Sequence, residues 1–168
     1  MATGRRIPRE KATAALTALL ETVCAGGPHA DCVTAVYVFG SYARGALTVG
    51  DVDTDIEYDA RLDPGVEREM LDNLVVGRDW NTPFRKALKP ARALQVMFGR
   101  HEMLVEPVLV YQRGDTLAGA RARVAAITPD PAAGARSATR STRRSSPSLT
   151  IWLARRASCS PSSSRPGC

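Results

Sequence analysis

Two strand-like runs decide how this chain folds: VTAVYVFGS at residues 33–41 and DVDTDIEYD at residues 51–59. The first is rich in β-branched and aromatic residues and too short for a typical helix, so it predicts a buried strand from Val33 to Phe39. The strand runs into Gly40-Ser41. Glycine allows a tight turn there, and free backbone N–H groups and the Ser41 hydroxyl can then point at an anion.

The second run alternates acidic residues with mostly apolar ones. Side chains of a strand alternate between its faces, so this pattern predicts one face that carries only carboxylates: Asp51, Asp53, Asp55, Glu57 and Asp59. Acids two residues apart are separated by roughly 6–7 Å of strand. Their oxygens can converge on one divalent ion or on two about 4 Å apart. Such hard oxygen ligands suit Mg²⁺ or Mn²⁺ rather than zinc.

Together the two runs resemble the signature of the DNA polymerase beta-like nucleotidyltransferase superfamily. That signature is apolar-Gly-Ser, a spacer and then Asp-apolar-Asp/Glu-apolar. Here it reads Phe39-Gly40-Ser41, residues 42–54 and Asp55-Ile56-Glu57-Tyr58. Within the superfamily, the chain is most similar to the small bacterial enzymes: the minimal and the aminoglycoside nucleotidyltransferases.

The resemblance implies an α/β (α+β) nucleotidyltransferase fold, with a small mixed sheet flanked by helices. It also implies transfer of a nucleoside monophosphate from an NTP, for which we expect ATP, to a hydroxyl acceptor with loss of pyrophosphate. Gly40 and Ser41 would hold the triphosphate, and Asp55 and Glu57 would bind the metal. Apart from the resemblance, Arg44 is a candidate phosphate contact, and a surface residue that closes the turn is the alternative. Overlapping Asp-x-Asp frames leave the register open, so Asp53 stands as the nearest substitute ligand.

A third carboxylate often acts in this family as a ligand or as the general base toward the acceptor. Glu106 is the acid inside a later apolar run, Met103 to Tyr111, which predicts a third strand. Pro107 demands an edge position or a bulge for that strand. Glu106 is therefore the candidate catalytic base, although an exposed edge position without chemistry is the alternative.

The flanking sequence predicts helices. An apolar period of three to four residues follows Pro8 and ends near Cys24, before Gly26-Gly27. An N-cap and a first-turn proline at Asp63-Pro64 open a helix to about Val76. The same signal at Thr82-Pro83 opens a helix through Leu94. A last helix begins at Asp115-Thr116 and fades near Ile127.

Charge divides the chain after Thr128. Residues 1–128 carry 16 basic and 16 acidic side chains, so the formal net charge of +6 lies in residues 129–168, which are rich in Ser, Arg, Ala and Pro. We expect one domain over 1–128 and a disordered tail over 129–168, because such a segment buries too little apolar surface to offset its ordering entropy. A frameshift in a GC-rich gene would give this composition, and a basic tail that touches nucleic acid is the competing interpretation.

Composition excludes other classes of protein. No apolar run approaches the roughly 20 residues of a membrane span, so we expect no membrane partner. Glu21 interrupts the apolar stretch near the start and no cleavage site follows it cleanly, so we expect a helix of a cytoplasmic protein rather than a signal peptide. The favoured function is a metal-dependent nucleotidyltransferase. A catalytically inactive nucleotide-binding or partner-binding module, as in a toxin–antitoxin pair, is the alternative function. An aminoglycoside is an alternative acceptor, although it would normally require a further helical domain.

Overall fold

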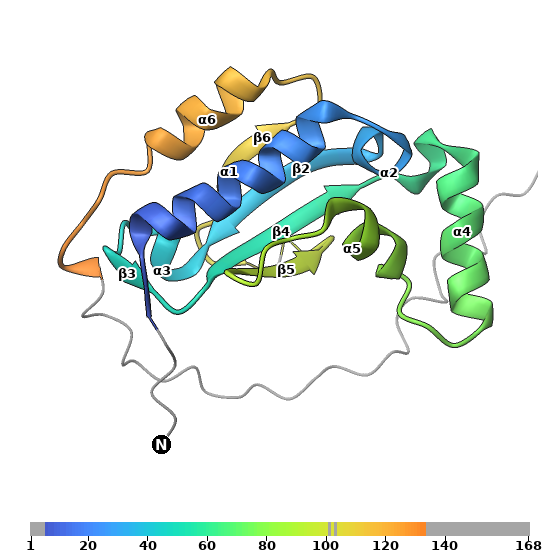
Figure 1. Cartoon of the computed structure of the whole chain (residues 1–168), viewed down its shortest axis with the longest axis horizontal. Coiled ribbons are helices and arrows are strands. Elements are labelled where there is room, and N and C mark those ends of the chain that lie inside the picture. Colours follow the sequence, from blue (N-terminus) through green and yellow to red (C-terminus); the bar gives the residue numbers. More distant parts are fainter. Residues whose placement is uncertain (1–5, 101, 103, 134–168) are drawn as a thin grey trace, which may run out of the picture. The chain divides into compact units, whose positions relative to one another are not determined.

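The computed structural model describes residues 6–100, 102 and 104–133 of the chain (Figure 1). Its elements follow one another as β1 (Ile7–Pro8), α1 (Arg9–Ala25), α2 (Pro28–Asp31), β2 (Val33–Phe39), α3 (Gly40–Ala43), β3 (Thr48–Val49), β4 (Val52–Tyr58), the 3₁₀ helix η1 (Ala60–Leu62), α4 (Pro64–Val75), α5 (Thr82–Leu88), β5 (Leu94–Phe98), β6 (Val108–Gln112) and α6 (Leu117–Ala125). No helix within this part of the chain is long and apolar enough to cross a membrane.

A four-stranded mixed sheet forms the centre, in the order β5-β4-β2-β6. β2 pairs antiparallel with both β4 and β6, whereas β4 and β5 run parallel. Phe39, the last residue of β2, is the partner of Asp53 in β4. The turn after β2 and the first half of β4 therefore lie at the same end of the sheet. The prediction of a mixed α/β fold is confirmed.

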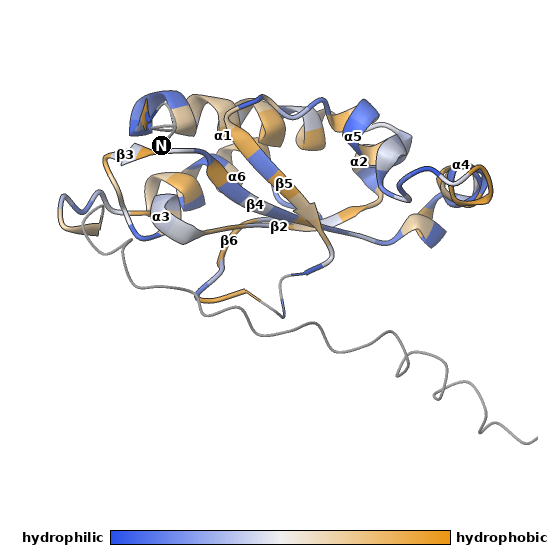
Figure 2. Cartoon of the chain, turned by 90° about the horizontal axis from the view of Figure 1, so that it is seen from below, coloured by the Kyte–Doolittle hydropathy of each residue, from blue (hydrophilic) through white to orange (hydrophobic). Residues whose placement is uncertain are grey.

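Helices α1, α5 and α6 lie on one side of the sheet (Figure 2). They bury one continuous apolar core against it, which includes Leu16, Leu20, Val36, Ile56, Phe84, Leu88 and Val124. A second, two-stranded sheet of β1 and β3 pairs Ile7 with Val49 and ties the start of α1 to the segment before β4.

The helix predicted from Thr82 through Leu94 is wrong in its second half. α5 ends at Leu88, and Lys89 adopts a left-handed φ of 43° directly before Pro90. A residue that precedes proline is disfavoured in the helical region, which explains the stop. Leu94–Phe98 is then free to pair with β4 as strand β5, an element that the sequence pattern did not predict.

The strand predicted from Met103 to Tyr111 is also shorter and later than expected. β6 covers Val108–Gln112, so Glu106 and Pro107 lie before the strand rather than inside it. Glu106 has a left-handed φ of 51° in the bend that leads into β6. The expected edge position is confirmed, and the β2–β6 pairing also contains an irregularity in register.

Residues 129–133, which were expected to belong to the tail, pack on the body. The N–H of Asp130 donates to the carbonyl of Gly45 at 2.8 Å, and Ala133 is only 2% exposed. The body thus extends at least five residues beyond the expected boundary. The rest of the predicted tail, residues 134–168, lies outside the described residues.

Candidate functional site

The two faces of β4 separate as the alternation predicts. Val52, Thr54 and Ile56 are fully buried on the side of the helices. Asp53, Asp55 and Glu57 project from the other face. Of the five carboxylates expected on one strand face, these three lie within β4, and the other two lie outside it.

Asp59 takes part in local structure beyond the end of β4. Its carboxylate accepts hydrogen bonds from the Arg61 backbone and guanidinium, the latter at 2.8 Å. These bonds from Arg61 hold the pKa of Asp59 below its ordinary value. Asp59 thus caps the 3₁₀ helix η1 and does not extend the acidic face.

Gly40 and Asp53 are in direct contact across the β2–β4 pair. Gly40 adopts a φ of +72°, and a Cβ atom built on it would collide with Oδ2 of Asp53. Glycine is therefore required for its backbone conformation and for the close approach of the carboxylate. The turn that was expected to hold phosphate and one of the candidate metal ligands share this end of the sheet.

Asp53 lies in an environment that disfavours its charge. Burial raises the pKa of its carboxyl group, and the negative charge of Asp51 raises it further. Arg44 lowers this pKa in part, so the guanidinium lies near enough to act on the carboxylate. A half-buried carboxylate beside a second acid is stabilised by a bound cation, and its hard oxygen atoms fit Mg²⁺ or Mn²⁺.

Asp55 is fully buried on the same face. Its Oδ2 accepts a hydrogen bond from the backbone N–H of Arg100 at 2.9 Å, so the chain after β5 returns to this carboxylate. Burial raises the pKa of Tyr37, and the charges of Glu57 and Asp55 raise it further, which places the phenol beside both acids.

Spacing ranks the three acids by their distance from the turn. Asp55 lies roughly 6–7 Å along the strand from Asp53, and Glu57 lies about 13 Å from Asp53. Glu57 is the partner of Ala35, four residues before the end of β2. Asp53 and Asp55 are thus the two acids of β4 nearest to Gly40-Ser41, whereas the preferred sequence register used Asp55 and Glu57.

The remaining predicted residues lie around the same end. Ser41 is half-buried in α3, and Arg44 is exposed where that short helix ends. Glu106 is exposed and precedes Val108, the partner of Val38 in β2. Its backbone therefore lies at the Gly40 end of the sheet, outside the strand in which it was expected.

Arg9 supports the segment that follows the Gly-Ser turn through hydrogen bonds to backbone carbonyls. This residue was not identified from the sequence. Its guanidinium donates to the carbonyls of Tyr42 at 2.9 Å, Ala46 at 3.3 Å and Ile127 at 2.9 Å. It also lies 4.3 Å from the centroid of the Tyr42 ring. The hydroxyl of Tyr42 bonds Thr13 of α1 at 2.8 Å. Arg9 therefore joins α1, the turn after β2 and the end of the body.

The concavity along α1 does not include the acids of β4. It has a volume of about 880 Å³ and involves Thr13, Ala14, Leu47 and Pro129. Within residues 6–100, 102 and 104–133, no cluster of three or more His, Cys, Asp or Glu side chains is arranged to hold a metal ion.

A scan of protein-family models and searches of curated proteins and solved structures find no match to this chain.

Proposed function

We propose that the chain is a metal-dependent nucleotidyltransferase that uses the Gly40 end of its sheet. The contact between Gly40 and Asp53 is the observation that carries this proposal. It joins an anion-binding type of turn to a carboxylate whose pKa is raised by burial and by a like charge. Such a pairing suits a ligand that carries both negative phosphates and a divalent cation.

In this proposal the backbone of the Gly40-Ser41 turn and the Ser41 hydroxyl donate hydrogen bonds to the triphosphate. Arg44, exposed at the rim, contributes positive charge to the phosphates. Asp53 and Asp55 would hold Mg²⁺ or Mn²⁺, and the ion would supply positive charge to the phosphates of the NTP. An acceptor hydroxyl attacks the α-phosphorus, and pyrophosphate leaves.

Glu106 is the proposed acceptor of the hydroxyl proton. It is exposed, and its place before β6 brings its backbone to the end of the sheet that carries the turn. A base must reach the attacking hydroxyl within hydrogen-bond distance once the substrate is bound. Glu106→Gln should therefore lower turnover and leave nucleotide affinity unchanged.

A non-catalytic nucleotide-binding module is the second candidate. One observation favours it: Asp55 is fully buried and already accepts the N–H of Arg100. A carboxylate held in this way binds a metal ion less readily than an open one. This module would bind NTP without releasing pyrophosphate.

The experiment measures binding of each labelled NTP to the full chain with Mg²⁺ and with a chelator, followed by a pyrophosphate assay with hydroxyl acceptors. We expect at least one NTP to bind only with Mg²⁺ and pyrophosphate to be released. Metal-dependent binding without release, whatever acceptor is supplied, would favour the second candidate. Failure of all four nucleotides to bind would contradict both.

A further inference from the structure

Positive charge is concentrated in one part of the body, although residues 1–128 are neutral as a whole. Residues 80–101 hold five of the 16 basic side chains and none of the 16 acidic ones. All five are exposed and lie on α5 or beside β5, which is an edge strand of the sheet. They are called the basic edge below: Arg85, Lys86, Lys89, Arg92 and Arg100.

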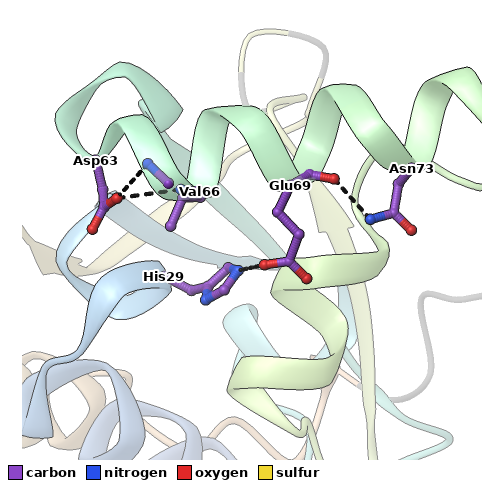
Figure 3. Close-up of polar contacts among 6 residues, drawn as sticks. His29, Asp63, Val66, Glu69 and Asn73 are labelled. Atoms are coloured by element: carbon purple, nitrogen blue, oxygen red, sulfur yellow. Dashed lines mark hydrogen bonds and ion pairs between the residues drawn. The ribbon is translucent and has the colours of Figure 1, made fainter.

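Several cations elsewhere in the body lie among acids. Three of them form ion pairs with acidic side chains: Arg61, Arg121 and Arg123. Arg68 of α4 stands between Glu67 and Glu69 in the sequence. Glu69 bonds Nε2 of His29 in α2 at 3.0 Å, so this surface combines acidic and basic groups (Figure 3).

The basic edge differs from these surfaces in its lack of neutralising partners. Arg85 lies 3.7 Å from the carboxylate of Asp79. The other four cations form no ion pair with the described part of the chain. The basic edge therefore presents an excess of one sign of charge, which attracts an anionic partner.

Contacts between α5 and β5 bring the members of the basic edge together. The Arg85 guanidinium donates to the carbonyl of Val96 at 3.1 Å and lies 5.1 Å from the centroid of the Phe98 ring. Lys89 follows one helical turn later, and its N–H bonds the carbonyl of Arg85 at 3.1 Å. Residues four apart lie on the same side of a helix, so Lys89 continues the row of cations toward the start of β5.

Both ends of β5 adjoin the acids of the candidate site. The carbonyl of the residue after Arg92 accepts the N–H of Val52 at 2.8 Å, directly before Asp53. At the other end, the N–H of Arg100 donates to Asp55 at 2.9 Å. A chain of negative charges that follows the basic edge would therefore pass beside both proposed metal ligands.

We propose that the basic edge binds the sugar-phosphate backbone of a single-stranded nucleic acid, and that this strand supplies the acceptor hydroxyl. Lys and Arg side chains bind phosphates whatever the base sequence. Arg92 and Arg100 lie beyond the two ends of roughly 16 Å of strand, so the row is long enough for several phosphates.

Two properties of the ligand favour a single strand over other polyanions. A nucleic acid combines a regular row of phosphates with free hydroxyl groups, and the proposed reaction needs a hydroxyl acceptor. A single strand can bend from the basic edge to the acids, whereas a duplex is stiff over about 150 base pairs. The role as acceptor rests on the proposed function, but binding of the strand does not.

Fluorescence anisotropy of the full chain with a labelled single-stranded RNA of about 20 nucleotides, and with DNA of the same sequence, measures binding without NTP or metal. Lys89→Gln/Arg92→Gln should raise the Kd at least about tenfold at about 0.1 M salt. The slope of log affinity against log salt should fall by about 1.4, because two phosphate contacts are lost.

Arg68→Gln/Arg113→Gln is the matched control. It removes the same two charges from exposed positions outside the basic edge, and both double variants keep the basic residues 129–168. The control should change the Kd less than about twofold. Circular dichroism should show that both variants remain folded. Equal losses in the two variants, or no binding by the wild type, would overturn the proposal.

Competition tests the chemical class of the ligand. Polyglutamate should displace the labelled strand far less well than the unlabelled strand does. Equal displacement would overturn the proposal, because the basic edge would then bind an acidic protein as readily as a nucleic acid.

Labelled NTP with Mg²⁺ tests the role as acceptor. We expect the wild type and the control to transfer label to the strand. Lys89→Gln/Arg92→Gln should transfer at least about tenfold less at limiting strand concentration, with NTP affinity unchanged. Pyrophosphate released only with other acceptors would overturn the acceptor role and leave the proposed function intact. Strand binding by a chain that binds no NTP would support the binding surface and contradict the proposed function.

Discussion

The two faces of β4 come from alternate residues of one seven-residue strand and have opposite properties. On one face, Val52 and Ile56 are fully buried in the core below the helices. On the other, Asp53 contacts Gly40 in an environment that raises its pKa. The buried apolar face of β4 therefore contributes most of the stability. The charge on the acidic face lowers the free energy of unfolding when no cation is bound.

This separation predicts that substitutions on the two faces change different properties.

Removing core volume from the apolar face should have the largest effect. Ile56→Ala should lower the free energy of unfolding by about 3–4 kcal/mol, because it deletes a fully buried side chain and leaves a cavity. Glu57→Ala, one residue away on the other face, should change it by less than about 1 kcal/mol. Urea denaturation followed by circular dichroism measures both values, and equal losses would refute the separation of the faces.

Gly40→Ala should cost about 2–3 kcal/mol and abolish nucleotide binding. Part of the cost is the left-handed φ, and the rest is the collision with Asp53. Gly77→Ala is the control, because Gly77 has a similar φ of +70° and nothing within 4 Å of an added Cβ. It should lose only the backbone part, about 1 kcal/mol, with binding intact. If both variants behaved alike, the contact with Asp53 would have no role.

Arg9→Met should lower the free energy of unfolding by about 1–2 kcal/mol, because three carbonyls lose a charged donor. NTP affinity should fall as well, since the Gly-Ser turn loses its support. Arg121→Met provides the comparison: it removes an exposed ion pair with Glu21 on the same helix α1. That change should cost less than about 1 kcal/mol and leave affinity unaltered. Titration with labelled nucleotide distinguishes the two variants.

The smallest expected effect is a dependence of stability on pH. The pKa of Asp53 is raised in the folded state, so its contribution is fully present below the ordinary carboxyl pKa and is lost as pH rises through the raised value. Asp53→Asn should therefore stabilise the metal-free protein at neutral pH by less than about 1 kcal/mol, since the side chain is only half-buried. The gain should vanish in acid.

Thermal unfolding over a series of pH values measures this gain. Addition of Mg²⁺ should stabilise the wild type more than the variant, because a ligand stabilises the state that binds it. A variant less stable than the wild type at neutral pH without metal would contradict the assigned environment of Asp53.

Local signals predicted the central part of this fold. The apolar run of β2, the alternation of β4 and the cap at Asp63 depend on neighbours in sequence, and each element formed within a residue or two of its expected bounds. The sequence order of Gly40-Ser41 and the acidic run also corresponds to a turn and a strand that the structure brings into contact at one end of the sheet.

The remaining features of the fold and of the candidate site could not be predicted, because they depend on contacts between residues that are distant in the sequence. β5 forms because Lys89 stops α5 and a strand some 40 residues earlier accepts Leu94–Phe98 as a partner. The Arg9 guanidinium meets carbonyls 33 and 118 residues away, for which the sequence has no local pattern. The register of the acids was ambiguous for the same reason, because the partner of Phe39 is fixed only by the pairing of β2 with β4.

The most direct test compares Asp53→Asn with Glu57→Gln, two isosteric changes on one strand face at different distances from Gly40. Metal-dependent NTP binding and pyrophosphate release are measured for both folded variants. We predict that Asp53→Asn loses both activities, whereas Glu57→Gln retains them. Retained activity in Asp53→Asn, together with loss in Glu57→Gln, would contradict a site at the Gly40 end of the sheet.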